Sequence, residues 1–134
     1  MTKVIITGAK GRMGQALVSC AKNFRDLKIV AAIDQGDDLK TVISKADAVV
    51  DFSSHDATPT IVELCAKNKK AVVIGTTGHS DSEKLQIKNC KSKIPMVLAS
   101  NFSTGVNTLF WLTRKAAEIL GTDFDLEIVR CIIA

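Results

Sequence analysis

Aromatic residues are scarce in this sequence, and tyrosine is absent. Phenylalanine and tryptophan make up 4% of the 134 residues. The net charge is +4, yet lysine and arginine are spread along the chain. The densest basic group, Lys67, Lys69 and Lys70, has no aromatic residue within it. Proteins that bind nucleic acids typically combine a basic patch with stacking rings. We therefore interpret the positive charge as a solvated face and expect no nucleic-acid partner.

Long apolar runs are also missing. No stretch approaches the roughly 18 apolar residues that a membrane span needs, and the N-terminal segment MTKVIITGAKG has no signal-peptide cleavage region. The hydrophobic fraction of 46% and the charged fraction of 24% are those of an ordinary globular protein. We expect one domain with a substantial core and no membrane partner, located in the cytoplasm.

The four cysteines form no recognisable motif. Cys20, Cys65, Cys90 and Cys131 lie far apart, without a C-x-x-C pair and without histidine at ligand spacing. This excludes a disulfide framework and the common zinc sites. We expect reduced thiols in a cytosolic protein and no bound metal.

Short β-branched segments alternate along the chain with longer amphipathic ones. This order predicts an α/β fold, a doubly wound (Rossmann-like), mostly parallel sheet with helices on both faces. Ligands of such sheets bind at the carboxyl ends of the strands. The predicted strands are Val4–Thr7, Lys28–Ile33, Ala48–Phe52, Ala71–Ile74, Met96–Ala99 and Leu126–Ile132, and the predicted helices are Arg12–Asn23, Leu39–Ser44, Ala57–Asn68, Ser80–Cys90 and Gly105–Leu120.

The loop after the first strand carries a glycine triplet. Gly8, Gly11 and Gly14 in TGAKGRMGQAL form G-x-x-G-x-x-G, a spacing variant of the dinucleotide-binding fingerprint. Such glycines permit a tight turn and a close approach of the backbone to pyrophosphate at a helix N-terminus. The alternative is a plain tight turn, but the position after the first strand favours dinucleotide binding.

Asp34 ends the second predicted strand, 20 residues after Gly14. A carboxylate at this point is placed to accept hydrogen bonds from an adenine ribose. It would repel the 2′-phosphate of NADP, and Gln35 supplies no compensating cation, although Lys10 or Arg12 could. The alternative is an Asp that only initiates a turn.

Three further loops offer candidates and open alternatives. Phe52 and Ser53 follow the third strand, where a pyrophosphate and the nicotinamide ribose would lie, whereas His55 is expected in solvent. Thr76 and Thr77, between Gly75 and Gly78, suit a carboxamide or ribose, unless the loop only caps the next helix through Ser80 or Ser82. The last loop holds Asn101, Phe102 and Ser103, and Phe102 could press on a nicotinamide or fill the core.

Four ordered motifs, GAKGRMG, VVDFS, GTTG and ASNFSTGVN, make the chain resemble the N-terminal domain of the dihydrodipicolinate reductase family up to about Val129. The resemblance implies reduction of a cyclic imine dicarboxylate to tetrahydrodipicolinate with NADH or NADPH, on the route to diaminopimelate and lysine. With the reading of the loops, it implies a cofactor site made of Gly8, Ala9, Lys10, Gly11, Arg12, Met13, Asp34, Phe52, Gly75, Thr76, Thr77, Ala99, Ser100, Asn101 and Phe102.

The chain departs from the family pattern in three ways. Gln35 stands where many members have an arginine, which favours NADH, and the segment 36–46 is short. The His-His-Arg-His-Lys and Ser-Gly-Thr segments, which in the family donate protons and bind substrate, do not follow Val129. We therefore expect residues 1–129 to be a dinucleotide-binding domain with no catalytic residue and no reductase activity. The tetramer interface belongs to the absent domain, which predicts a monomer or non-specific association.

The tail Arg130–Ala134 has a possible origin in the genetic code. Deleting one base from codons for Glu-Met-His-His-Arg, the sequence the family implies, yields the observed Arg-Cys-Ile-Ile-Ala. We hypothesise a frameshift at this point. The alternative is a natural short protein with an apolar, β-prone end, and either would favour self-association. Two other functions stay open: a free-standing NAD(H)-binding module, or the cofactor half of another amino-acid dehydrogenase.

Overall fold

The chain forms two compact units, Met1–Ser100 and a second that begins at Asn101. Residues 1–129 are described by the structure, a computed structural model, and the last five residues lie outside it. The hypothesis about Arg130–Ala134 and the last residues of the predicted strand Leu126–Ile132 therefore remain predictions.

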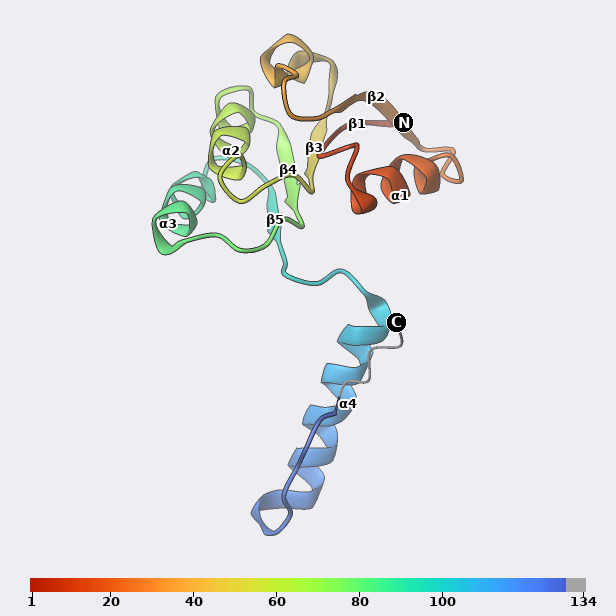
Figure 1. Cartoon of the computed structure of the whole chain (residues 1–134), viewed down its shortest axis with the longest axis vertical. Helices are drawn as coiled ribbons and strands as arrows, with labels where there is room; N and C mark the ends of the chain where they lie inside the picture. Colours follow the sequence, from red (N-terminus) through yellow and green to blue (C-terminus); the bar gives the residue numbers. More distant parts are fainter. Residues whose placement is uncertain (130–134) are drawn as a thin grey trace. The chain divides into compact units, whose positions relative to one another are not determined.

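The first unit is built on a parallel sheet of five strands in the order β2-β1-β3-β4-β5 (Figure 1). The strand order reverses between β1 and β3. The first crossover places β2 on one side of β1, and the next crossover places β3 on the other side. This confirms the doubly wound α/β fold. The elements of this unit are β1 (Thr2–Thr7), α1 (Arg12–Ala21), β2 (Leu27–Ile33), the 3-10 helices η1 (Leu39–Thr41) and η2 (Ile43–Lys45), β3 (Ala48–Asp51), α2 (Thr58–Lys67), β4 (Ala71–Ile74), α3 (Asp81–Cys90) and β5 (Met96–Leu98).

Alternating burial along the central strands shows which face of the sheet carries the main core. In β3, Val49 is fully buried and Val50 half-buried, and Val72 and Val73 repeat this in β4. The buried side chains pack with apolar residues of α2 and α3, among them Val62 and Ile87. Helices α2 and α3 cover this face, and α1 packs on the other face against β1 and β2 (Figure 1). Helices on both faces are therefore confirmed.

Helix α3 begins with a capping box. The Ser80 side chain accepts from the backbone N–H of Glu83, and the Glu83 carboxylate accepts from the backbone N–H of Ser80 at 2.6 Å. These bonds satisfy backbone donors that a helix N-terminus leaves without partners. Of the two cap candidates, Ser80 and Ser82, the structure selects Ser80.

The helical segment predicted over about Leu39–Ser44 is present, but it is of a tighter type than the α-helix. The segment forms two 3-10 turns, the first capped by the Asp38 side chain, which accepts from the backbone N–H of Lys40 at 2.9 Å. Leu39 and Ile43 are buried in the core. Leu39 and Ile43 are four residues apart, a spacing that fits both helix types. The segment is too short for the i-to-i+4 hydrogen bonds of an α-helix to be favoured over the i-to-i+3 bonds of a 3-10 helix.

The second unit contains α4 (Thr104–Leu120) and the 3-10 helix η3 (Gly121–Asp123). Ser103 caps α4 by accepting from the backbone N–H of Val106 at 3.3 Å. The predicted strand at Leu126 is wrong for residues 126–129, which are irregular. A strand requires a hydrogen-bonded neighbour, and no ladder among residues 1–129 includes this segment. Within the same residues, no helix is long and apolar enough to cross a bilayer.

Candidate functional site

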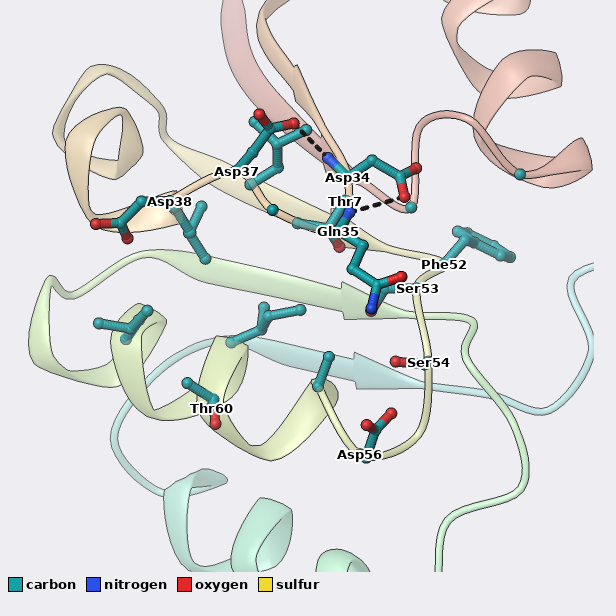
Figure 2. A pocket seen from close by; sticks show the side chains of 18 of the residues that line it. Thr7, Asp34, Gln35, Asp37, Asp38, Phe52, Ser53, Ser54, Asp56 and Thr60 are labelled. Atoms are coloured by element: carbon teal, nitrogen blue, oxygen red, sulfur yellow. Dashed lines mark hydrogen bonds between the residues drawn. The ribbon is translucent and has the colours of Figure 1, made fainter.

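A pocket of about 820 Å³ opens at the carboxyl edge of the sheet, where strand order reverses between β1 and β3. Its walls come from the loops after β1, β2 and β3 and from the first turns of α2 (Figure 2). This volume lies in the range of small-molecule sites, and the place is the one at which doubly wound sheets bind ligands.

Two of the three glycines of the G-x-x-G-x-x-G motif, Gly8 in the β1–α1 loop and Gly14 in the first turn of α1, are required by close packing. A Cβ on Gly8, whose φ is +72°, would lie 2.2 Å from the backbone oxygen of Phe52. A Cβ on Gly14 would lie 2.1 Å from the backbone oxygen of Gly8. Gly11 is less crowded, and its N–H donates to the Gly8 oxygen at 3.1 Å. The loop therefore turns tightly and packs directly against both α1 and the β3–α2 loop.

Asp34 joins the loops after β1 and β2. Its Oδ2 accepts from the backbone N–H of Lys10 at 2.7 Å, and its Oδ1 accepts from the backbone N–H of Gln35 at 2.8 Å. These two hydrogen bonds, the one from Lys10 first, hold the pKa of Asp34 below its usual value. Each carboxylate oxygen can accept a second hydrogen bond. Asp34 is therefore an ionised acceptor with capacity left for a ligand.

The charged side chains that line the pocket are mostly acidic. Asp34, Asp37, Asp38 and Asp56 all line it, and Lys40 is the one basic residue among the residues lining it. Figure 2 shows Asp34, Asp37 and Asp38 along the segment after β2, with Asp56 on the opposite side. Carboxylates gathered in this way favour neutral hydroxyl donors over an anionic group.

The carboxyl end of β3 holds a residue that sequence reasoning missed. Asp51, the last residue of β3, is fully buried, and its carboxylate accepts from the hydroxyls of Thr7 at 2.6 Å, Thr58 at 2.7 Å and Thr76 at 3.2 Å. The signal was present in VVDFSS, where a carboxylate follows two valines of a buried strand. The prediction for this motif considered only Phe52 and Ser53.

Phe52 lines the pocket, but its ring reaches toward β4. A Cβ on Gly75 would lie 2.2 Å from two ring carbons of Phe52. Figure 2 shows the ring directed away from Asp37 and Asp38. Gly75 thus makes room for Phe52, a reason that the sequence did not suggest.

The predicted residues are only partly brought together. Gly8, Gly11, Asp34 and Phe52 line the pocket, whereas the other candidates of the first unit lie outside its lining. Thr76 is buried against Asp51, and Thr77 is exposed. Asn101 and Phe102 open the second unit, where Asn101 accepts from the backbone N–H of Ser103 at 2.9 Å. The candidates outside the lining are Ala9, Lys10, Arg12, Met13, Gly75, Thr76, Thr77, Ala99 and Ser100.

His55, expected in solvent, has a partner at the surface. Its Nδ1 lies 2.9 Å from Oε1 of Glu83, the capping residue of α3. This contact raises the pKa of His55 and lowers that of Glu83 to about 2. Among residues 1–129, no cluster of three or more histidine, cysteine or acidic side chains is arranged to hold a metal ion.

Comparison with known proteins identifies the family to which this sequence is similar. Residues 2–102 match the family model "Dihydrodipicolinate reductase, N-terminus". The 4-hydroxy-tetrahydrodipicolinate reductase of Akkermansia muciniphila is 44% identical over 129 residues, covering 96% of this chain and 52% of the relative. That of an Anaeromyxobacter species is 37% identical over 150 residues, covering 96% and 56%. The chain therefore spans about half the length of these curated relatives.

Solved structures agree. A dipicolinate-bound dihydrodipicolinate reductase from Paenisporosarcina superimposes with a TM-score of 0.77 at 26% identity, covering 87% of this chain and 54% of that one. A yeast saccharopine dehydrogenase, at 15% identity and a TM-score of 0.64, shares the fold alone. The family model matches residues 2–102, well over half of the chain, and this stretch includes the residues that line the pocket. The chain therefore belongs to the dihydrodipicolinate reductase family and matches its N-terminus.

Proposed function

We propose that the chain is the dinucleotide-binding part of a 4-hydroxy-tetrahydrodipicolinate reductase and that it prefers NADH to NADPH. The observation that carries this proposal is Asp34, an ionised carboxylate held at the pocket by the backbone N–H groups of Lys10 and Gln35. The relatives that bear the reductase name support the reaction class.

The residues present fit a dinucleotide. The β1–α1 loop has no side chain at Gly8 or Gly11 to block a pyrophosphate, and α1 begins directly after it, at Arg12. No acidic side chain occupies the first turn of α1, so the partial positive charge of the helix N-terminus stays available to phosphate. We assign the pyrophosphate to the segment Gly8–Met13 and the adenine ribose to Asp34.

The preference for NADH follows from charge. The free oxygen positions of Asp34 can accept from the 2′- and 3′-hydroxyls of a ribose, while a 2′-phosphate at that point would face Asp34 with Asp37 and Asp38 nearby in the same wall. Gln35 offers no positive charge, and Arg12 is outside the lining of the pocket. Two cations, Lys10 beside Asp34 and Lys40 in the lining, face the three carboxylates of this wall and leave it negative.

For the nicotinamide end we propose Phe52, Gly75–Thr77 and Ala99–Ser100, from the loops after β3, β4 and β5 of the first unit, while Asn101 and Phe102 stay predictions from the sequence. When bound, the cofactor supplies a hydride, and the protein supplies position and electrostatics. Reduction of the cyclic imine also needs a proton donor and a substrate site, for which we propose no residue in this chain. We therefore expect cofactor binding without turnover. Tetramer formation is expected to need the rest of the reductase, and the free thiols Cys20, Cys65 and Cys90 are consistent with a cytoplasmic location.

Titration of the 134-residue chain with NADH and with NADPH, by calorimetry or by nicotinamide fluorescence, tests the proposal. We expect NADH to bind at least about fivefold more tightly than NADPH, since one repulsive charge contact near a partly exposed site is worth on the order of 1 kcal/mol. Equal affinities would contradict the preference, and no binding of either would contradict the function.

Asp34→Asn and Asp47→Asn form a matched pair for that titration. Asp47 also accepts a backbone N–H, that of Lys3 at 2.7 Å, but it precedes β3 and so lies at the opposite edge of the sheet. We expect Asp34→Asn to weaken NADH binding and to reduce the preference over NADPH. Asp47→Asn should leave both unchanged.

A further inference from the structure

Asp51 is a buried carboxylate for which the proposed function assigns no role. It has no exposed surface, and it ends β3 at the edge of the sheet that carries the pocket. Burial of a carboxylate is costly unless hydrogen bonds satisfy its oxygens. Asp51 meets this condition, because each of its two oxygens accepts from at least two donors.

The donors come from separate parts of the chain. Oδ1 accepts from the hydroxyl of Thr7, the last residue of β1, and from the backbone N–H and hydroxyl of Ser53. Oδ2 accepts from the hydroxyls of Thr58, the first residue of α2, and Thr76, which follows Gly75. One carboxylate therefore connects the ends of β1 and β3, the start of α2 and the loop after β4.

The connected segments are in contact with one another around Asp51. The backbone N–H of Phe52 donates to the oxygen of Thr7 at 3.2 Å, and that of Gly75 donates to the oxygen of Asp51 at 2.9 Å. Gly8 packs against the backbone of Phe52 and Gly75 against its ring, both without room for a Cβ. A shift at Asp51 is therefore transmitted to the backbone of Gly8 and Gly75, since these contacts leave no free space.

The chemistry of the cluster calls for a carboxylate. Every partner donates, and four hydroxyls and one N–H converge on oxygens that can only accept. An asparagine would present an NH₂ group to one pair of these donors, which would force them to rotate or to lose their bonds.

We propose that Asp51 is a positioning residue for the dinucleotide: its buried carboxylate holds the loops after β1, β3 and β4 in the relative arrangement that the cofactor requires. This inference rests on the proposed function for the identity of the ligand. Asp51 acts through Thr7, Ser53 and Thr76 and is itself out of contact with the pocket, whose lining does not include it.

The test compares Asp51→Asn with Val49→Ala in the 134-residue chain. Val49 is equally buried in the same strand, but it belongs to the apolar core and has no side-chain polar atom that could bond the loops after β1, β3 and β4. Both variants should unfold at a lower temperature. We expect Asp51→Asn to weaken NADH binding by about tenfold, the effect of losing one or two charge-assisted hydrogen bonds. Val49→Ala should bind NADH as the wild type does.

Hydrogen exchange provides a readout that does not depend on the cofactor. In Asp51→Asn, the amides of Gly8–Gly11 and Gly75–Gly78 should exchange faster, while those at the centres of β1 and β4 stay protected. If the wild-type chain binds no NADH, the proposed function fails, and the exchange data still decide whether Asp51 holds the loops. Unchanged exchange in these loops, or equal loss of NADH affinity in Val49→Ala, would overturn the inference.

Thr58 offers a second pair in case Asp51→Asn does not fold. Thr58 is fully buried and lies outside the pocket lining, so its hydroxyl can act only through its neighbours. Thr58→Val removes the donor at nearly constant volume, and Thr58→Ser retains it. We expect a several-fold loss of NADH affinity in the first variant and near wild-type affinity in the second. Equal affinity in both would count against the role of the cluster.

Discussion

The backbone N–H of Lys10 donates to Oδ2 of Asp34 across 24 residues of sequence, at 2.7 Å. This bond ties the glycine loop after β1 to the end of β2. The segment that we assign to pyrophosphate and the carboxylate that we assign to ribose are therefore held next to each other. Since the same bond lowers the pKa of Asp34, the carboxylate stays ionised throughout the physiological range.

Cofactor preference should reverse when the charge at this point is reversed. We expect Asp34→Ser combined with Gln35→Arg to bind NADPH more tightly than NADH, because a guanidinium pairs with a 2′-phosphate and the repelling carboxylate is gone. Titration with both cofactors measures the change. Asp34→Ser alone is the control, and it should lose NADH affinity without gaining NADPH affinity. A double variant that still prefers NADH would show that the preference arises elsewhere in the pocket.

Gly8→Ala should destabilise the fold more than Gly36→Ala does. Both glycines have positive φ, +72° and +96°, so alanine costs each about 1–3 kcal/mol of backbone strain. Only at Gly8 would the new Cβ also overlap the backbone of Phe52, whereas Gly36 has no atom within 4 Å of that point. Denaturant unfolding of the two variants gives the comparison. Equal losses would mean that the β3–α2 loop can move away from Gly8.

The His55–Glu83 contact should make stability depend on pH in two directions. The raised pKa of His55 means that its contribution is complete below about pH 6.5, its unfolded value, and is lost as pH rises through the folded pKa. The lowered pKa of Glu83 means that its contribution is present above pH 4.5, its unfolded value, and is lost as pH falls toward the folded pKa of about 2. Thermal unfolding of His55→Asn should therefore differ most from the wild type near about pH 5.5. A difference that is the same at pH 5.5 and at pH 9 would contradict this.

Cysteine reactivity should follow burial. In a Cys131→Ser background, we expect a thiol reagent to modify Cys20, which is exposed, and to leave Cys65 and Cys90 unmodified until the chain unfolds. The pKa of Cys65, raised to about 12 by burial and by the charge of Asp51, leaves almost no thiolate at neutral pH. Mass spectrometry after a timed reaction identifies the modified residues. Rapid labelling of Cys65 in the folded chain would show that the main core opens readily.

Much of the architecture was predictable from local patterns. The apolar runs that ended at Thr7, Ile33 and Ile74 gave strands with the expected carboxyl ends, because each run is terminated by a polar or glycine-containing loop. The segment from Leu39 was harder, since its few apolar residues are compatible with more than one helix type. The strand expected from Leu126 failed for residues 126–129, since β-propensity without a pairing neighbour does not make a strand.

Some residues of the candidate site were also predictable from the sequence, and others were not. Gly8, Gly11 and Asp34 were accessible from the sequence because their spacing reflects one βαβ unit, and they do line one pocket. The carboxylate of Asp51 after two valines was visible in the sequence, but its role was not, because its partners Thr7, Thr58 and Thr76 are up to 44 residues away and only the sheet brings them together. The role of Gly75 was likewise hidden, since it depends on where the ring of Phe52 lies.

Local sequence patterns were enough to predict the succession of strands and helices through β5, the edge of the sheet at which a ligand would bind and the family, because hydrophobic periodicity and short motifs are local properties of the chain. Three features emerge only from the fold: the reversal of strand order between β1 and β3, the acidic side chains that two loops present to one pocket, and the single buried carboxylate that joins four segments. These features depend on pairing and packing between distant residues, and local sequence carries no record of those distances.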